Sequence, residues 1–323
     1  MTGGVRWGIL GTANIARAAF LPGLRAAGAE AWAVAGRDGA RTEAWARQQG
    51  VAHAVEGYER LLDLDEVEAV YIPLPNSLHK EWAIRALRAG KPVLCEKPLG
   101  LNAAEVQAMV RASRETGVPL WEAFVFMFRP HFAKLSAWIQ DGAIGMLTEI
   151  DSRFSFRIRS TANIRLEPAL GGGALYDVGC YPVHLATRLI GSSADAAAVS
   201  GRRHPAGVDE TVAGVVEFPE ARLLFSASLA GPADTFTRVS GTEGAVVCSN
   251  PFHPTDRDWL ALTRGGETTL LSAGDGRPSF AAAIEHVGRV VRGEEAPSFV
   301  AAETSLSTAA TLDRIRGAPG FPA

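Results

Sequence analysis

Between residues 6 and 124 the chain alternates short apolar runs with longer amphipathic stretches, and this rhythm constrains the fold more than any other feature. The apolar runs are Trp7–Leu10, Ala31–Ala35, Val67–Pro73, Pro92–Glu96 and Pro119–Phe124. Helical patterns between them include Ile15–Ala26, Leu78–Ala89 and Ala104–Thr116. Apolar runs that are buried on both faces and separated by helices are typical of a parallel sheet built from βαβ crossovers. The first half is therefore predicted to be α/β.

After Phe124 the pattern changes to that of a largely antiparallel sheet. A helical stretch at Pro130–Asp141 precedes Leu147–Phe156, where polar and apolar residues alternate as in a half-exposed strand. Strand-like segments then follow one another across short turns, at Ala197–Arg202, Thr211–Phe218, Arg222–Ala230 and Thr235–Ser240. Two helical segments follow, Phe280–Arg292 and Ala301–Arg316. Since 323 residues exceed what one core usually serves, we predict two domains, residues 1–123 and 124–323.

Composition and charge argue against several classes of protein. A formal net charge of −3 gives no electrostatic reason to expect binding to nucleic acid or to an acidic membrane. The chain shows no long apolar run that predicts a bilayer-spanning helix, and its start lacks the basic region of a secretory signal. Cys95, Cys180 and Cys248 have no CxxC spacing, which favours buried thiols in a reduced, cytoplasmic protein. The seven histidines form no HxxxH or HExxH pair, so no metal site is expected.

The first apolar run leads directly into a glycine turn and then a helical pattern. A dinucleotide needs such a tight turn, close approach of the backbone to its pyrophosphate, and a helix N-terminus facing the phosphate charge. Gly11 supplies the bend, whereas Ala13 and Ala16 stand where the usual fingerprint has its second and third glycines. Asn14 can cap the helix or bind a phosphate. A glycine turn without a nucleotide is the alternative, which the βαβ setting disfavours.

The end of the second apolar run bears on which nicotinamide cofactor is bound. NAD calls for an acidic residue there, on the adenosine ribose. Here the run ends in Gly36, which leaves room for a 2′-phosphate, and in Arg37, whose guanidinium can bind one. Asp38 stands one position late and can cap the next helix. We predict NADP as the cofactor and NAD as the second option, with a solvated Arg37 as the alternative interpretation.

Two later runs end in residues suited to the nicotinamide end of the cofactor. Ligands of doubly wound sheets bind beyond the carboxyl ends of the strands. Lys97, followed by Pro98, stands at one such end, and Pro75 and Asn76 stand at another, where they can lie against the ribose or the ring. A solvated lysine is the alternative for Lys97. The sequence leaves open whether the Lys97–Pro98 peptide is cis.

In the second half, a glycine triplet at Gly171–Gly173 opens a further helical pattern. Its polar residues Asp177, Tyr181 and His184 recur at i, i+4 and i+7, which places them on one helix face. A solvated face is the alternative, although a phenol between a carboxylate and an imidazole is unusual there. Pro182 predicts an irregular start to the helix.

Taken together, the Gly11–Ala16 turn, the Glu96–Pro98 motif and the Gly171–Tyr181 helix resemble the Gfo/Idh/MocA family of oxidoreductases. Asn163–Gly173 is especially similar to the branch of NADP-dependent D-xylose 1-dehydrogenases and dimeric dihydrodiol dehydrogenases. The resemblance spans both halves of the chain. It implies an N-terminal Rossmann domain with a doubly wound parallel sheet. It also implies a C-terminal α/β domain with a large, mainly antiparallel open sheet, through which a homodimer or higher homo-oligomer forms.

The resemblance also implies roles for individual residues. Lys97 orients and polarises the reacting oxygen, Tyr181 is the general acid/base, and Asp177 is an orienting carboxylate. The implied cofactor-binding residues are Gly11, Thr12, Ala13, Asn14, Ile15, Gly36, Arg37, Pro75, Asn76, His79, Glu96 and Lys97. The implied substrate-binding residues are Glu122, Phe124, Arg129, Arg165, Asp177 and His184. Met127 and Arg129 stand where relatives carry Arg and His, which predicts an altered substrate pocket.

These features predict an NAD(P)-dependent dehydrogenase that moves a hydride between nicotinamide C4 and a sugar, polyol or related small alcohol or carbonyl. A lysine ammonium beside Tyr181 would favour its phenolate. Two alternatives remain. A glycosidase that uses bound NAD transiently would retain its cofactor and produce no net NADPH. A non-catalytic cofactor-sensing regulator commonly lacks the lysine or the acid/base residue, and both are present here.

Overall fold

The computed structural model describes residues 4–160, 162–297 and 300–322. The chain forms two compact units. The first comprises Met1–Gly100, Ala104–Val125 and Arg277–Glu303, and the second Leu101–Ala103, Phe126–Gly276 and Thr304–Ala323. The predicted domains, residues 1–123 and 124–323, differ from these units because residues 277–303 belong to the first unit.

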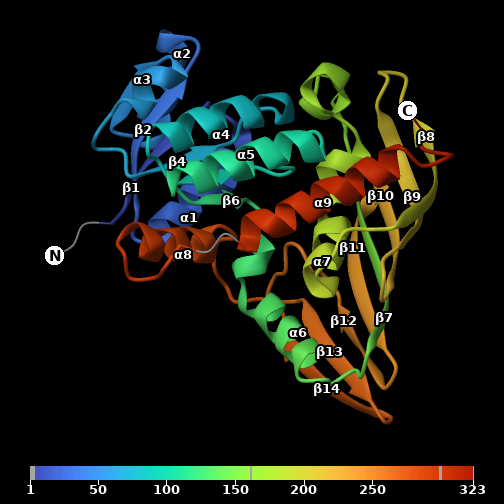
Figure 1. Ribbon diagram of the computed structural model, residues 1–323. Helices are drawn as coiled ribbons and strands as arrows, with labels where there is room; N and C mark the ends of the chain where they lie inside the picture. The colour runs from blue at the N-terminus through green and yellow to red at the C-terminus, as the bar shows by residue number, and fades with distance from the viewer. Residues whose placement is uncertain (1–3, 161, 298–299, 323) are drawn as a thin grey trace. The chain divides into compact units, whose positions relative to one another are not determined.

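A six-stranded parallel sheet forms the centre of the first unit (Figure 1). Its strands are β1 (Arg6–Leu10), β2 (Glu30–Gly36), β3 (His53–Glu56), β4 (Ala69–Ile72), β5 (Val93–Cys95) and β6 (Leu120–Glu122). The helices of this unit are η1 (Ala16–Phe20), α1 (Leu21–Ala26), α2 (Gly39–Gln49), α3 (Tyr58–Leu62), η2 (Asn76–Leu78), α4 (His79–Arg88), α5 (Ala103–Thr116) and α8 (Ala281–Val291). The strand order β3-β2-β1-β4-β5-β6 is that of a doubly wound Rossmann sheet, which confirms the predicted fold.

An aromatic cluster explains why α8 joins this unit. The ring of Phe20 stacks on Tyr71 with centroids 3.9 Å apart, and it meets Phe280 edge-on at 5.7 Å. Gly23 of α1 lies so close that an added Cβ would come within 2.6 Å of the Phe280 Cβ. The apolar side of α8 therefore completes the core of the first unit, although more than 150 residues separate it from β6 along the chain.

An eight-stranded sheet forms the second unit, in the order β14-β13-β12-β11-β7-β10-β9-β8. Its strands are β7 (Leu147–Arg157), β8 (Ala196–Arg203), β9 (Asp209–Glu217), β10 (Arg222–Ser228), β11 (Ala230–Gly241), β12 (Gly244–Cys248), β13 (Trp259–Arg264) and β14 (Glu267–Ser272). The remaining helices are η3 (Val125–Phe128), α6 (Pro130–Gln140), η4 (Ile164–Leu166), η5 (Pro168–Leu170), η6 (Leu175–Gly179), α7 (Cys180–Ile190) and α9 (Val300–Arg316). All strand pairs are antiparallel except β7 with β10, which confirms the predicted, mainly antiparallel sheet.

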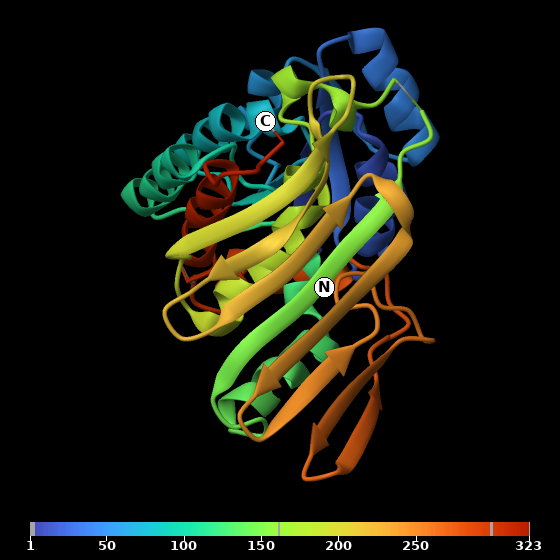
Figure 2. The ribbon, with the colours of Figure 1, turned by 90° about the vertical axis from the view of Figure 1, so that its right-hand side faces the viewer.

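One face of this sheet packs on helices and the other is exposed. In Figure 2 the sheet faces the viewer, and α6 and α7 lie behind it. Along β7 the side chains alternate, so that Ile150 and Ser152 are buried whereas Arg153 is exposed. On the exposed face Arg153 pairs with Asp234 at 2.7 Å and lies over the ring of Phe236. A charged and partly aromatic surface therefore covers the central strands.

Two helical stretches begin with a π-helical turn, and each turn is followed by a proline. The turn η1 ends at Phe20, two residues before Pro22, and η6 ends at Gly179, three residues before Pro182. A proline donates no hydrogen bond to the carbonyl four residues earlier, and its ring crowds that carbonyl. The wider π turn accommodates this crowding. The irregular start predicted from Pro182 is therefore confirmed.

The three cysteines are free and buried, as predicted. Within the residues that the structure describes, no helix is both long and apolar enough to cross a membrane. The same described ranges contain no group of three His, Cys, Asp or Glu side chains placed to hold a metal ion.

Removing the Phe20 ring should destabilise the first unit strongly. Phe20→Ala deletes a buried ring that contacts Trp7, Tyr71 and Phe280, and such deletions cost roughly 3–5 kcal/mol. We expect this loss in urea denaturation followed by circular dichroism. The control Met146→Ala, at a side chain that is 75% exposed, should change the free energy of unfolding by less than about 0.5 kcal/mol. A loss below about 1 kcal/mol for Phe20→Ala would contradict the assigned packing.

Candidate active site

The turn after β1 has the geometry that its glycine predicts. Gly11 adopts a φ of +106°, which other residues rarely adopt, and its N–H donates to the Ala35 carbonyl at 2.7 Å. An added Cβ would lie 3.1 Å from Leu74 in the loop after β4. The turn, the end of β2 and the loop after β4 therefore meet at one edge of the sheet.

The helix start after this turn is exposed and carries a cation that sequence reasoning missed. Thr12 and Ala13 are half-buried, and Asn14 and Ile15 are exposed. Asn14 Oδ1 accepts a hydrogen bond from Arg17 Nη2 at 2.7 Å, so its side chain orients a guanidinium instead of capping the helix. Arg17 carries no motif that singles it out, and only the contact with Asn14 shows where its guanidinium lies.

At the end of β2 the first acidic side chain caps the next helix. Asp38 Oδ1 accepts from the Arg41 N–H at 3.0 Å and so caps α2, as one interpretation of the sequence proposes. Gly36 is packed so tightly that an added Cβ would lie 2.2 Å from Thr42 Oγ1. Arg37 and Arg41 are exposed, and within the described ranges neither guanidinium has an ion-pair partner. Arg41 is a second cation that the sequence analysis did not single out.

Side chains from three elements hold the loop that carries Lys97. Tyr71 of β4 donates its hydroxyl to Glu96 Oε1 at 2.6 Å. Glu122, at the end of β6, accepts from the Leu99 N–H at 2.8 Å. The Lys97–Pro98 peptide is cis, which answers the question that the sequence left open. Glu96 and Glu122, predicted to bind cofactor and substrate, thus contact the protein's own loop.

His79 joins the loops after β4 and β5. Its Nδ1 lies 2.8 Å from the Pro98 carbonyl oxygen, and its Nε2 lies 2.8 Å from that of Leu74. Burial lowers the pKa of this imidazole, and the two carbonyls oppose that shift. His79 is fully buried with both nitrogens engaged, so it fixes the two loops, and its role in binding the cofactor stays a prediction. Pro75 and Asn76 lie in the loop that it holds, both half-buried.

In the second unit, Asp177 is paired with Arg165. Arg165 Nε donates to Asp177 Oδ2 at 2.6 Å, and its guanidinium lies over the ring of Phe156. The Arg165 side chain is 41% exposed and that of Asp177 is 13% exposed. The structure thus brings together two residues that the resemblance assigns to the substrate.

Aromatic rings surround Tyr181 on the same helix. Phe154 and Phe252 lie with ring centroids 5.1 Å from that of Tyr181, and His253 lies at 5.6 Å. His253 follows β12 in the sequence, about seventy residues after Tyr181, so no local pattern pointed to it. The Tyr181 ring is buried, and an apolar environment that excludes water strengthens electrostatic interactions at its hydroxyl.

His184 shares the predicted helix face but lies buried. Tyr181 and His184 both contact the ring of Phe126, as their spacing predicts. His184 Nδ1 lies 3.0 Å from Thr308 Oγ1, and burial lowers its pKa to about 3. The imidazole is therefore neutral near pH 7 and packs against α9, and its assignment as a substrate contact stays a prediction.

Two predicted substrate residues that precede α6 are buried. Arg129 is buried, pairs with Asp275, and donates to the Pro254 carbonyl at 3.2 Å. A buried guanidinium needs such partners, since an unpaired buried charge is costly. Phe124, at the end of the first unit, is buried. The departure from the family pattern at Arg129 therefore reflects an internal ion pair.

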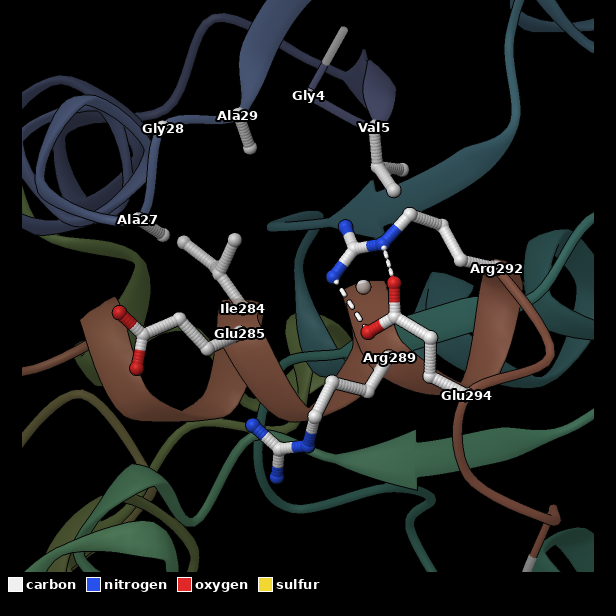
Figure 3. Close-up of a pocket in the computed structure, with 11 residues that line it drawn as sticks. Gly4, Val5, Ala27, Gly28, Ala29, Ile284, Glu285, Arg289, Arg292 and Glu294 are labelled. Carbon is white, nitrogen blue, oxygen red and sulfur yellow. Dashed lines mark hydrogen bonds and ion pairs between the residues drawn. The ribbon is translucent and has the colours of Figure 1, made fainter. Parts of the chain in front are cut away.

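A separate pocket of about 250 Å³ lies in the first unit, at the amino end of β1 (Figure 3). Gly4, Val5 and the loop at Ala27–Ala29 face α8 across it. Arg292 and Glu294 join through two hydrogen bonds of 2.6 and 3.1 Å, so their charges satisfy each other. Ligands of such sheets bind at the carboxyl ends of the strands, so this pocket is not part of the candidate site.

A doubly wound sheet with a glycine turn after β1, a free cation after β2 and a fixed lysine after β5 defines a class of nicotinamide-dependent α/β oxidoreductases. The family model described as an oxidoreductase family with an NAD-binding Rossmann fold matches residues 5–124. The model of the GFO/IDH/MocA C-terminal domain matches residues 132–247. The chain therefore belongs to the Gfo/Idh/MocA family of NAD(P)-dependent oxidoreductases, which confirms the resemblance and the prediction of an enzyme.

Relatives cover three quarters of the chain or more. It is 36% identical over 313 residues to D-xylose 1-dehydrogenase (NADP(+)) 2 of Haloferax volcanii, covering 96% of this chain and 95% of the relative. It is 34% identical over 251 residues to human trans-1,2-dihydrobenzene-1,2-diol dehydrogenase, covering 76% and 75%. A solved 3-ketoreductase from Actinomadura kijaniata, in complex with NADP and TDP-benzene, has a TM-score of 0.86 at 29% identity, with 97% of each chain covered.

The burial of neutral His184 should make the fold sensitive to acid. Its pKa of about 3 lies below that of an unfolded histidine, so the unfolded chain binds a proton that the folded chain excludes. Stability is therefore complete above about pH 6.5 and falls as the pH drops towards 3. We expect the free energy of unfolding to fall by roughly 1.4 kcal/mol more per pH unit than in His184→Gln, between about pH 6 and 4. Parallel pH dependences for the two proteins in urea titrations would contradict the assignment.

Proposed function

We propose that the protein transfers a hydride between nicotinamide C4 of NADP and the hydroxyl- or carbonyl-bearing carbon of a sugar, polyol or related small alcohol. The observation that carries the proposal is the fixed position of Lys97 at the carboxyl end of β5, where hydrogen bonds to Glu96, Pro98 and Leu99 restrain its loop. A lysine that only interacts with solvent has no need of such a loop. The same edge of the sheet is where dinucleotides bind.

The residues at this edge fit an NADP molecule. Gly11 at positive φ permits close approach of the backbone, and the exposed start of η1 presents N–H groups and Arg17 to a pyrophosphate. Arg37 and Arg41 supply cations for a 2′-phosphate, and Asp38 is occupied as a helix cap. The relative from Haloferax volcanii carries NADP(+) in its name, and the solved 3-ketoreductase contains NADP, which supports the same preference here.

The bound nicotinamide supplies a hydride acceptor or donor at C4. In the oxidative direction, Tyr181 takes the hydroxyl proton on its phenolate oxygen, while the hydride leaves the same carbon and a carbonyl forms. Lys97 donates a hydrogen bond to the reacting oxygen and, as a cation, favours the phenolate of Tyr181. In reduction the same two groups polarise and protonate the carbonyl. Asp177, oriented by Arg165, accepts a hydrogen bond from a neighbouring substrate hydroxyl.

A sugar-like substrate suits the side chains around Tyr181. Phe154, which is half-buried, offers an apolar ring to C–H groups, while Asp177 and Arg165 offer an acceptor and donors to hydroxyl groups. The names of the relatives point the same way, since they include a D-xylose dehydrogenase, a dTDP-sugar 3-reductase from Streptomyces violaceoruber and a diol dehydrogenase. We therefore place the substrate among sugars, polyols and related diols.

We further propose that the protein is cytoplasmic and forms a homodimer or higher homo-oligomer through the exposed face of the eight-stranded sheet. Free, buried cysteines suit a reducing compartment. Trp259 and Leu270, on the paired strands β13 and β14, are exposed large apolar side chains next to the charged central strands. Such a mixture of apolar and charged groups suits a specific protein interface.

Removing Lys97 or Tyr181 should abolish most of the turnover. We expect Lys97→Met and Tyr181→Phe to lower kcat by roughly 10²–10⁴-fold, the usual contribution of acid–base groups, with the cofactor still bound. The measurement is NADPH absorbance with a panel of aldoses, polyols, diols and dicarbonyls. Lys134→Met, which removes an exposed ammonium beside Trp138 on α6, should leave turnover unchanged.

A Lys97→Met enzyme that kept most of its turnover would contradict the assignment. An unaltered protein that turned over none of the panel, yet held nucleotide through purification, would instead favour the glycosidase or the regulator.

Removing Arg37 should change the choice of cofactor. Arg37→Ala deletes a guanidinium available to the 2′-phosphate, and a lost charge-assisted hydrogen bond of about 1.5–3 kcal/mol weakens binding about 10–100-fold. We expect this loss in the Kd for NADPH by fluorescence titration, with the Kd for NADH unchanged. Arg47→Ala, at an exposed residue of α2 paired with Glu43, is the control and should alter neither. Equal weakening of both cofactors would contradict a 2′-phosphate role.

A further inference from the structure

A buried carboxylate lies at the N-terminal end of the helix that carries Asp177 and Tyr181. Asp209, the first residue of β9, accepts a hydrogen bond from the Leu175 N–H at 2.6 Å and also interacts with that of Ala174. Only 8% of its surface is exposed. The first N–H groups of a helix have no acceptor within the helix, and a carboxylate placed there both accepts from them and is favoured by the helix dipole. Asp209 therefore caps this helix from a distant strand.

The last glycine of the Gly171–Gly173 triplet is required by this carboxylate. A Cβ built on Gly173 would lie 2.1 Å from Asp209 Oδ1, and the φ of Gly173 is +115°. Any larger residue would displace the carboxylate from the helix end. The position of Asp209 therefore explains why residue 173 is a glycine.

A second contact fixes the same turn from α9. Arg316 Nη1 donates to the hydroxyl of Tyr176 at 2.6 Å, and that hydroxyl donates to the Leu101 carbonyl. Burial raises the pKa of Tyr176 to about 12, so the phenol keeps the proton that it donates. The start of the helix is therefore held on two sides, immediately before Asp177 and one turn before Tyr181.

We propose that Asp209 is a positioning residue for the reaction: by capping the helix start, it sets the places of Asp177 and Tyr181. Its effect on catalysis presupposes the function proposed above, whereas the cap itself does not. Asp209 contacts this helix at the backbone N–H groups of Ala174 and Leu175, so we infer that it acts on Asp177 and Tyr181 through the helix backbone.

The protonation of Asp209 connects this cap to pH. Burial raises the pKa of the carboxyl from 3.8 to about 6, while the N–H donors and Arg316 oppose the shift. Arg316 of α9 and the phenol of Tyr176 interact electrostatically with Asp209, and Asp313 of α9 acts on Tyr176. Below about pH 6 the carboxyl takes up a proton and becomes a weaker acceptor for the Leu175 N–H. The cap, and with it the placement of the helix start, therefore weakens in acid.

Three variants test the proposal. Asp209→Asn keeps an acceptor oxygen but does not ionise, and Asp209→Ala removes the acceptor. Thr311→Val is the matched control, because it deletes a buried side-chain acceptor for the Ala194 N–H, 3.0 Å away in the same unit. The readouts are amide hydrogen exchange over residues 173–181 and kcat between pH 5 and pH 8.

For Asp209→Ala we expect at least tenfold faster exchange across residues 173–181 and at least a tenfold lower kcat, with the KM for cofactor within twofold. The unaltered enzyme should show an acid limb in kcat near pH 6. Asp209→Asn, whose amide oxygen is a neutral acceptor like the protonated carboxyl, should lack this limb and should keep, at pH 7.5, only the reduced kcat that the unaltered enzyme reaches in acid. Thr311→Val should leave both the exchange and the acid limb unchanged.

An acid limb that persisted unaltered in Asp209→Asn would overturn the proposal. If Asp209→Ala did not fold, the pH profile of Asp209→Asn would decide. If the unaltered protein had no NADP-linked turnover, the proposed function would fail first. Exchange in the variants would then still decide the cap, and unchanged exchange in Asp209→Ala would overturn it.

Discussion

Hydrogen bonds from buried side chains to the loop after β5 are the interaction on which the candidate site depends. A parallel sheet delivers its strands to one edge, but the loop beyond a strand has no ladder partner to fix it. Here Glu122 accepts from Leu99, His79 meets the Pro98 carbonyl, and Tyr71 holds Glu96. Since a buried backbone group without a partner is costly, these bonds leave the loop few alternative arrangements. Lys97 gains a defined position from side chains that need not touch a ligand.

The features that could be predicted from the sequence are those set by neighbours in the chain. The bend at Gly11, the cap at Asp38 and the irregular start before Pro182 each depend on a few consecutive residues. The buried strands of the first unit could be predicted because each is a continuous apolar run. Strand β3 was missed because His53–Glu56 is a short edge strand with a single branched apolar side chain, and β14 because every residue of it is exposed.

The sequence does not predict how far each polar side chain is buried or which residue it pairs with. Helical spacing places His184 beside Tyr181, but only the packing of α9 buries it against Thr308. Arg129 is a cation of the kind that often binds ligands, but it pairs with Asp275, which lies 146 residues further along the chain. For a similar reason, the sequence did not predict that α8 belongs to the first unit, because more than 150 residues separate it from β6. Periodicity predicts which face of a helix carries a side chain, whereas its function depends on which residues or solvent that face contacts.

The two π-helical starts show how one local device serves two purposes. Both η1 and η6 precede a proline, and both present backbone N–H groups at the start of a helix that carries candidate site residues. In η6 the protein supplies the anion itself, as the buried carboxylate of Asp209. In η1 no side chain among the described residues caps the helix, and the nearby charge is the cation Arg17. A helix start that already holds a carboxylate is closed to an anionic ligand, whereas one that lacks it and lies beside a guanidinium favours an anion from outside. This difference in charge, more than the number of glycines in the turn, distinguishes the two helix starts. The start at η1 suits a pyrophosphate, whereas the start at η6 only positions side chains.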